Sequence, residues 1–379
     1  MQYTDFKHDG IKVSRFGLGT MRLPKVKDED GTERINEPEA IAMIRKAIDS
    51  GVNYIDTAYI YPGSEKVVGK ALKDGYREKV ILATKLPVSM VKEQGDLQKF
   101  LDTELERLQT NYIDVYFLHN LYTANWKKVL EFNALDFMTD LKKKGIIKYI
   151  AVSMHEKYEH FEHVIDFFDW DLAMIQYNYY DRFNQAGEKG LKYAAAKGIP
   201  VVTMESLHGG MLSTNVPQKV QDAFGNWNKD KSDAEKSFMW LYNQPEVTVI
   251  LSGVSTMEQL EENLKIFENA QPNCLTAEEL ELYEAARKAW NSFINVECTG
   301  CAYCMPCPMG VDIPTAFQLY NDFAKSQAQS WLYNVMLILS GKDATKCVAC
   351  GKCEKQCPQQ IKIIDTLKAA HEAMAPKQA

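Results

Sequence analysis

Hydrophobic residues recur along the first part of the chain in short runs that alternate with amphipathic, helix-like segments. Eight runs have the length and the β-branched or aromatic content of strands; they span residues 16–20, 53–57, 80–84, 113–118, 149–153, 172–176, 200–204 and 247–251. Several of them, such as residues 80–84, scarcely alternate between apolar and polar positions. That pattern is typical of strands that helices bury on both faces. The segments between the runs carry helix signals, such as Pro38 near the start and Gly51 at the end of one of them.

Eight successive strand–helix units predict an α/β protein with a closed (β/α)8 barrel over residues 1–290. A doubly wound open sheet is the alternative, and periodicity alone does not distinguish the two. Ahead of the first unit, residues 3–7 and 11–14 flank the pair Asp9-Gly10, which is a hairpin signal. We therefore expect an N-terminal hairpin followed by the barrel.

The composition is that of a folded protein. Of the 379 residues, 46% are hydrophobic and 25% are charged, which excludes collagen-like, low-complexity and largely disordered chains. The formal net charge of -7 argues against a nucleic-acid partner. No apolar run is long enough to span a bilayer, and the first residues lack the order of a secretion signal. We expect a cytoplasmic protein with no membrane partner.

Polar side chains stand at the ends of three successive predicted strands. Asp56 ends the second strand with Tyr61 shortly after it, Lys85 follows the third, and His119 follows the fourth. Taken singly, a lysine after a strand is usually a solvated loop residue, and a histidine is more often structural than catalytic. Together they would converge at one mouth of a barrel, where such enzymes place their chemistry.

The segments around these residues resemble the aldo-keto reductase family. The resemblance is carried by GVNYIDTAYIYPGSEKVVGKAL, VILATKLP and YIDVYFLHN, and it covers residues 1 to about 290. It implies a (β/α)8 barrel that uses a nicotinamide cofactor without a Rossmann fold. The absence of a G-x-G-x-x-G motif agrees, because Gly17-Leu18-Gly19-Thr20 lacks the third glycine.

The resemblance implies an NAD(P)H-dependent oxidoreductase that reduces a small carbonyl substrate or oxidises the corresponding alcohol by hydride transfer. By position, Tyr61 is the acid that protonates the substrate oxygen, and Lys85 is the ammonium that eases proton release from the phenol. Asp56 is expected to keep Lys85 charged and oriented. His119 is expected to hydrogen-bond the substrate oxygen.

Cofactor contacts are carried over from the same resemblance. Ser153 and Gln176 match the positions that bind the nicotinamide amide, but Met154 and His155 stand where the family commonly has Asn after that serine. The segment from Leu251 to Asn263 resembles the clamp on the adenosine phosphate, yet it contains no Arg or Lys to pair with a 2′-phosphate. NADPH remains our expectation over NADH. The predicted cofactor-binding residues are Gly19, Thr20, Ser153, Gln176, Gly209, Gly253, Ser255, Gln259 and Asn263.

Eight of the nine cysteines fall between residues 298 and 357. CVACGKCEKQCP is the ferredoxin-type run C-x2-C-x2-C-x3-C-P, and CTGCAYCMPCP differs from it by one residue. The repeat predicts a mainly helical domain over residues 291–379 that holds two 4Fe-4S clusters. The expected ligand sets are Cys298, Cys301, Cys304 with Cys357, and Cys347, Cys350, Cys353 with Cys307.

Zinc is the alternative for these cysteines, although zinc sites more often use two separated C-x2-C pairs, and disulfides do not suit the compartment. Cys274 stands apart, and we expect it to be a small buried apolar residue. Between the two runs, five aromatic residues are interpreted as core, in two helices of which the second ends at Gly341; they are Phe317, Tyr320, Phe323, Trp331 and Tyr333.

The two parts transfer electrons in different numbers. A hydride carries two electrons in one step, whereas each cluster carries one. The clusters therefore either exchange electrons with a ferredoxin or another redox partner, through an intermediate such as a flavin that splits the pair, or hold the domain together. Two further hypotheses stay open at this point: a redox-sensing or electron-carrying interaction protein with a nucleotide-binding barrel, and a flavin-dependent iron-sulfur reductase.

Overall fold

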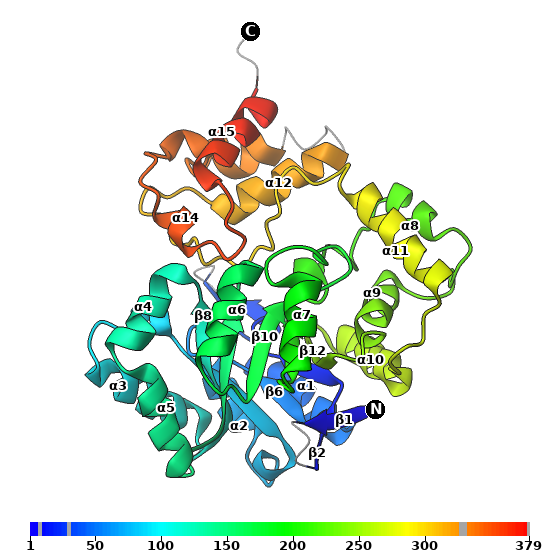
Figure 1. Cartoon of the computed structure of the whole chain (residues 1–379). Coiled ribbons are helices and arrows are strands. Elements are labelled where there is room, and N and C mark those ends of the chain that lie inside the picture. The colour runs from blue at the N-terminus through cyan, green and yellow to red at the C-terminus, as the bar shows by residue number, and fades with distance from the viewer. Residues whose placement is uncertain (7–9, 29–31, 326–331, 377–379) are drawn as a thin grey trace. The chain divides into compact units, whose positions relative to one another are not determined.

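The computed structural model describes residues 1–6, 10–28, 32–325 and 332–376, and Figure 1 shows its course from the N-terminus to the C-terminus. The chain forms two compact units. The barrel unit comprises residues 1–207 and 234–276, and the C-terminal unit comprises residues 208–233 and 277–379. The second unit thus draws in one segment of the chain that precedes residue 290. A domain boundary at residue 290 stays a prediction.

The barrel unit contains a closed barrel of eight parallel strands in the order β10-β11-β12-β3-β6-β7-β8-β9. This closure confirms the predicted barrel and excludes the open sheet. Each predicted run overlaps one strand, and four of the strands extend beyond their runs: β3 (Phe16–Gly19), β6 (Tyr54–Asp56), β7 (Ile81–Leu86), β8 (Ile113–Leu121), β9 (Ile147–Met154), β10 (Leu172–Gln176), β11 (Val201–Met204) and β12 (Val247–Gly253).

Helices follow the strands around the barrel, and several begin and end at the residues that the sequence marks. Helix α1 (Glu37–Asp49) has Pro38 in its first turn and stops just before Gly51, whose φ is +95°. The other α-helices of this unit are α2 (Ser64–Ala71), α3 (Gly95–Leu108), α4 (Thr123–Glu131), α5 (Ala134–Lys143), α6 (Tyr158–Phe167), α7 (Gly187–Ala196), α9 (Asp233–Tyr242) and α10 (Met257–Ile266). Short 3-10 turns, η1 (Arg77–Lys79), η2 (Val88–Met90) and η4 (Phe267–Asn269), complete the connections.

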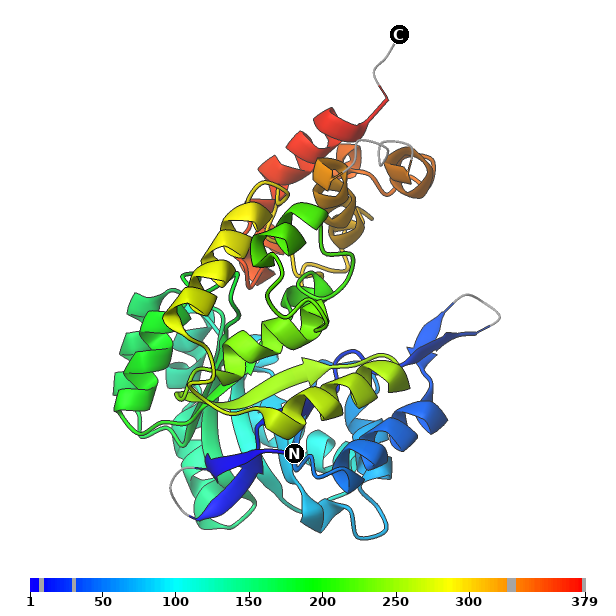
Figure 2. The same cartoon turned by 90° about the vertical axis from the view of Figure 1, so that its right-hand side faces the viewer.

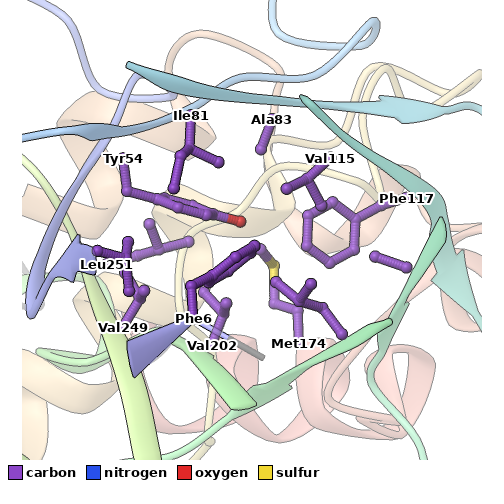
Figure 3. Close-up of a cluster of buried hydrophobic side chains, with 13 residues drawn as sticks. Phe6, Tyr54, Ile81, Ala83, Val115, Phe117, Met174, Val202, Val249 and Leu251 are labelled. Carbon is purple, nitrogen blue, oxygen red and sulfur yellow. The ribbon is translucent and has the colours of Figure 1, made fainter. Parts of the chain in front are cut away.

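Apolar side chains fill the interior of the barrel (Figure 3). The N-terminal hairpin of β1 (Tyr3–Phe6) and β2 (Ile11–Ser14) forms as expected, although Asp9 of its turn lies outside the described residues. Phe6 packs edge-to-face on Tyr149, with 5.0 Å between ring centroids, and belongs to the interior cluster. Because Tyr149 lies early in β9, the hairpin closes the end of the barrel at which the strands begin.

A second hairpin, of β4 (Lys25–Lys27) and β5 (Glu33–Ile35), extends from the barrel after β3 (Figure 2). A backbone hydrogen bond of 2.8 Å from Asn36 N–H to the Pro24 carbonyl closes its base. The sequence did not predict this hairpin, because its strands are short and mostly polar.

Helices α2 and α3 approach closely at Gly69. A Cβ at this position would lie 2.5 Å from the Arg107 carbonyl oxygen and 2.7 Å from the Leu108 carbonyl group. Backbone atoms cannot turn aside, so we expect Gly69→Ala to lower the free energy of unfolding by about 1–3 kcal/mol in chemical denaturation. Gly95, where the nearest atom would be Glu93 Oε1 at 3.9 Å, provides the control. Gly95→Ala should be neutral or stabilising by up to about 1 kcal/mol, and equal effects of the two changes would contradict this close packing.

The C-terminal unit is mainly helical, as predicted. Its elements are η3 (His208–Gly210), α8 (Gln218–Phe224), α11 (Ala277–Trp290), α12 (Ile313–Lys325), the π-helical η5 (Asn334–Ile338), η6 (Ala344–Lys346), α14 (Lys352–Gln356) and α15 (Ile363–Met374). Phe317 and Tyr333 are buried in its apolar core, and Tyr320 and Phe323 pack against that core, as interpreted from the sequence. Trp331 lies outside the described residues. Within the described part of the chain, no helix has the length and apolarity needed to cross a membrane.

Candidate functional site

The inward-facing side chains of the strands change from apolar in the barrel interior to polar at the mouth. The interior cluster contains Tyr54, Ala83 and Phe117 from three neighbouring strands. Because side chains two residues apart share one face of a strand, the next inward positions are Asp56, Lys85 and His119, listed here in strand order. On the next two strands the same step leads from Ala151 to Ser153 and from Met174 to Gln176.

Lys85 and Asp56 form a buried ion pair at this mouth. The Lys85 ammonium donates to Asp56 Oδ1 at 2.6 Å and to the Thr57 carbonyl at 2.7 Å. The two side chains are only 1% and 5% exposed. The other oxygen of the carboxylate, Asp56 Oδ2, is buried and accepts no hydrogen bond from the described residues. The lysine is therefore held in one orientation on the floor of the mouth.

The aromatic members of the predicted set lie beside this pair. Lys85 Nζ lies 5.1 Å from the centroid of the Tyr61 ring. The Tyr61 and His119 rings meet edge-to-face, with centroids 6.2 Å apart. His119 is 5% exposed, whereas Tyr61 is only partly buried. The structure thus brings together Asp56, Tyr61, Lys85 and His119, with the phenol on the more open side.

Burial shifts the pKa values of these groups, and the ion pair opposes the shift. Burial raises the pKa of Asp56 and lowers the pKa of Lys85, and in both cases the partner's charge counteracts the effect. Burial, reinforced by the positive charge of Lys85 and by His155, lowers the pKa of His119 well below its usual range. His119 is therefore neutral at neutral pH, and a neutral imidazole has one N–H to donate.

Two buried glutamates behind the ion pair were missed at the level of sequence. Glu65 accepts from Thr84 Oγ1 at 2.7 Å and from Arg107 Nη1 at 3.1 Å. Glu104 is fully buried and accepts from the Tyr116 hydroxyl at 2.6 Å. Burial, and then the charge of Glu65, raises the pKa of Glu104 well above its ordinary value. Both carboxyls favour the charged form of Lys85, but a glutamate on a helix is normally solvated, so no sequence signal singled them out.

Gln176 and His155 form a second polar group at the mouth, next to Ser153. The amide of Gln176 donates to Asp181 at 2.8 Å and accepts from Gln185 at 3.2 Å. His155 Nδ1 is buried and has no hydrogen-bond partner among the described residues. Ser153 and Gln176 thus lie buried at the ends of neighbouring strands, and His155 adds a buried polar atom beside them.

The buried His155 provides a pH-dependent test. Burial, opposed by hydrogen bonding to Gln185 and Gln176, lowers its pKa to about 4. The unfolded chain, with a histidine pKa of about 6.5, therefore binds this proton first, so stability should fall as the pH drops from about 6.5 towards 4. In urea denaturation, the free energy of unfolding of the wild type should fall by about 1 kcal/mol more between pH 7.5 and pH 5.5 than that of His155→Asn. Equal losses would show that His155 is not buried in its neutral form.

The predicted phosphate segment lies at the end of β12. Gly253 pairs with Gly19 of β3 and leaves bare backbone at the mouth. Ser255 N–H donates to the Gln259 side chain at 2.8 Å, and Asn263 Nδ2 donates to the Ser252 hydroxyl at 3.0 Å. Thr20, also in the predicted set, donates to the Asp56 carbonyl at 2.8 Å.

Arg22, which the sequence did not single out, lies next to this segment with its backbone and Cβ. A Cβ on Gly253 would be 3.5 Å from Cβ of Arg22, and the Ser255 hydroxyl donates to the Arg22 carbonyl at 2.8 Å. The segment itself has no Arg or Lys, but Arg22 reaches it from the loop after β3. Because the two are far apart in sequence, only the closed barrel reveals the pairing.

Several residues after β11 have a left-handed backbone conformation. Glu205, His208, Gly209 and Gly210 all have positive φ, at 54°, 45°, 66° and 99°. Ser206 and Leu207 separate Glu205 from the other three residues, which belong to the C-terminal unit. Gly209, the residue predicted here, lies within this stretch.

The first predicted set of cysteines lines one pocket of the C-terminal unit. Cys298, Cys301, Cys304 and Cys357 surround it together with apolar residues that include Ile313 and Phe317. Burial, together with the neighbouring thiols, raises the pKa of Cys304 to about 12. A neutral thiol is favoured there unless iron supplies positive charge.

Of the second set, Cys347, Cys353 and Cys307 pack against the apolar core, whereas Cys350 is exposed. Within the described residues, which include all nine cysteines, no three His, Cys, Asp or Glu side chains converge as they do around a single metal ion. The four thiols of the first set line the same pocket, and zinc stays the alternative to a four-iron cluster on this geometry alone. Cys274 is exposed, so the expectation that it is a buried apolar residue is wrong.

Backbone angles support the internal repeat. Gly300 and Ala302 flank Cys301 with φ of 69° and 62°, and Ala349 and Gly351 flank Cys350 with φ of 53° and 70°. Two cysteine loops with different side chains therefore adopt the same left-handed conformation at matching positions.

Comparison with known proteins agrees with this geometry. The family model of the aldo/keto reductase family matches residues 15–286. The chain belongs to the aldo/keto reductase family. Its residues 297–361 match the model of a 4Fe-4S dicluster domain, so this member combines the family's barrel with a helical iron-sulfur region.

This aldo/keto reductase is similar to the following two proteins of known sequence and one of known structure. Aldo-keto reductase YhdN of Bacillus subtilis (strain 168) is 33% identical over 235 residues, which cover 58% of this chain and 66% of YhdN, slightly less than two thirds. L-galactose dehydrogenase of Arabidopsis thaliana is 26% identical over 278 residues, or 67% of this chain and 84% of that protein. The holo form of aldo-keto reductase AKR11C1 from Bacillus halodurans superposes with a TM-score of 0.62 at 25% identity, covering 76% of this chain and 97% of that chain.

Proposed function

We propose that the barrel catalyses hydride transfer between a nicotinamide cofactor, NADPH in preference to NADH, and a small carbonyl compound or the corresponding alcohol. The observation that carries the proposal is the buried Lys85–Asp56 pair beneath the Tyr61 and His119 rings. Family membership shows an oxidoreductase. One relative is named a dehydrogenase, which fits the alcohol-oxidising direction.

Four side chains at the mouth would each have a separate role in the reaction. Reduced nicotinamide supplies a hydride to the carbonyl carbon when it is bound. Tyr61 donates the proton that the developing alkoxide requires, and the fixed ammonium of Lys85 stabilises the phenolate that remains. Neutral His119 donates an N–H to the same substrate oxygen and so sets its angle. Asp56 holds Lys85 in place.

Cofactor binding would use the polar groups around the mouth. Ser153, Gln176 and the buried Nδ1 of His155 suit the amide of the nicotinamide ring. The segment from Gly253 to Asn263 suits the adenosine phosphate, and Gly209, which lies in the C-terminal unit, is carried over as a pyrophosphate contact from the family resemblance alone. Arg22 lies beside that segment, and its guanidinium would be the partner for the 2′-phosphate of NADPH.

The C-terminal unit would hold two 4Fe-4S clusters that exchange single electrons with a redox partner. The pocket ringed by Cys298, Cys301, Cys304 and Cys357 supports the first cluster. The matching backbone of the second cysteine loop supports an equivalent site there. The match to a dicluster domain supports two sites rather than one.

Steady-state kinetics on the anaerobically purified protein test the barrel's activity. NADPH oxidation against a panel of aldehydes and ketones should show turnover with at least one of them, with NADPH preferred to NADH. Tight NADPH binding without turnover on any carbonyl or alcohol would instead indicate an interaction protein with a nucleotide-binding barrel. Extraction of bound small molecules, with iron and sulfide analysis, should yield no flavin and about eight iron atoms per chain, as two four-iron clusters require. A stoichiometric flavin would overturn direct use of the nicotinamide at the mouth.

A further inference from the structure

The two cysteine loops share one backbone but differ in their surroundings. Residues 297–307 form the first loop, and residues 346–355 form the second. At matching positions the first loop has Thr299, 6% exposed, where the second has Val348, 59% exposed. Cys301 is partly buried, whereas its counterpart Cys350 is exposed. The second loop is therefore the one that presents its cysteine site to solvent.

The second loop, which is more exposed, is also the more basic of the two. Glu297 precedes the first cysteine of one loop, and Lys346 precedes that of the other. Lys346, Lys352 and Lys355 are all exposed, and none forms an ion pair within the described residues. From residue 341 to residue 368 the chain has six lysines against three acidic residues, although the whole chain has a net charge of -7.

Apolar exposure accompanies this charge. Val348 lies between Lys346 and Lys352, and Met309, two residues beyond Cys307, is 44% exposed. A small apolar contact with a charged rim is the arrangement of a weak, transient protein interface, and redox encounters form the low end of interface sizes. The rim charges of such an interface mainly set the association rate.

We propose that the second cysteine loop is the docking face for an acidic one-electron carrier protein, with Val348 as its apolar centre and Lys346, Lys352 and Lys355 as its rim. The inference rests on the proposed redox role of the clusters. One electron would pass from the reduced carrier, which is oxidised, to the cluster that Cys347, Cys350, Cys353 and Cys307 would hold, which is reduced. The more buried first site does not exchange electrons with the carrier directly.

Stopped-flow reduction of the full-length holoprotein by a reduced, acidic [2Fe-2S] ferredoxin tests the proposal. The change is Lys346→Gln/Lys352→Gln/Lys355→Gln. The control removes three exposed barrel lysines, Lys73→Gln/Lys127→Gln/Lys144→Gln, so that the net charge is identical. At low ionic strength we expect the rate constant for reduction of the loop variant to be about one tenth of the wild-type value or lower, and to depend less on salt. The rate constant of the control should change by less than about twofold.

Two further variants separate charge from shape. The triple Lys→Arg variant of the loop should restore the wild-type rate, because it keeps the charge. Val348→Ser should slow the reaction at all salt concentrations alike. Iron content and reduction by dithionite should be unchanged in every variant.

The outcomes distinguish the docking face from the redox role. Failure of dithionite to reduce the wild-type clusters would refute the proposed redox role itself. Clusters that dithionite reduces but ferredoxin does not, or equal slowing in the loop and control variants, would overturn the docking face. The same applies if the loop variant changes only the oligomeric state in sedimentation, because a second copy of the chain would then occupy this face.

Discussion

Tyr61→Phe is expected to reduce carbonyl turnover by about 10²- to 10⁴-fold, the range of general acid catalysis, while NADPH binding stays within about twofold of the wild type. The change removes a single oxygen and keeps the aromatic ring that lies 6.2 Å from His119 and 5.1 Å from Lys85 Nζ. The proton donor is lost and the shape of the mouth is kept. Steady-state kinetics, with NADPH binding measured by fluorescence titration, give the two quantities.

Tyr59→Phe is the matched control. Tyr59 is two residues away, and its ring packs edge-to-face on Phe100 and under Arg107 rather than beside Lys85. This variant should retain nearly full activity. Equal losses in the two variants would mean that the phenol of Tyr61 has no special part in the reaction, and full activity of Tyr61→Phe would remove it as the acid.

Cys357→Ser is expected to remove one cluster, with the iron content falling from about eight to about four atoms per chain. Although Cys357 lies ten residues from Cys347 in sequence, the pocket groups it with Cys298, Cys301 and Cys304. The lost cluster should therefore be the one that the distant first loop holds. Iron analysis and electron paramagnetic resonance of the reduced protein measure the loss.

Cys274→Ser provides the control, because Cys274 is the one cysteine outside both predicted sets, and it is exposed. It should leave the iron content unchanged. The double variant Cys298→Ser/Cys357→Ser should lose no more iron than Cys357→Ser alone. Loss of both clusters in the double variant but only one in each single variant would show that the two cysteines belong to different sites.

Much of the barrel could be predicted from the sequence, because the strand periodicity and the positions of the polar residues both depend on which side chains face the barrel interior. Residues two apart share a face, so the apolar interior at Phe117 and the polar mouth at His119 belong to one inward series. This is why a set of unremarkable strand-end residues identifies a mouth. The strand periodicity, however, does not tell a closed barrel from an open sheet. The pairing of β12 with β3 shows that the sheet is closed.

Other features depend on contacts that no local pattern records. Glu104 lies on a helix that reads as solvated, and its burial depends on Tyr116 of the barrel. Arg22 reaches the phosphate segment through a contact between the β3 loop and the end of β12. Cys274 is exposed although an isolated cysteine is commonly buried. In each case the three-dimensional neighbour, rather than the residue type, decides the environment.

The central claim is that hydride moves directly between the nicotinamide and the substrate carbon at the mouth formed by Asp56, Tyr61, Lys85 and His119. Single-turnover reduction of a carbonyl substrate with NADPH deuterated at the transferring C4 position, analysed by mass spectrometry, tests it most directly. The account predicts one deuterium on the carbinol carbon of the product, in protein with intact clusters and in Cys357→Ser alike. Product that carries hydrogen from solvent at that carbon would contradict it, because the electrons would then have travelled through another carrier.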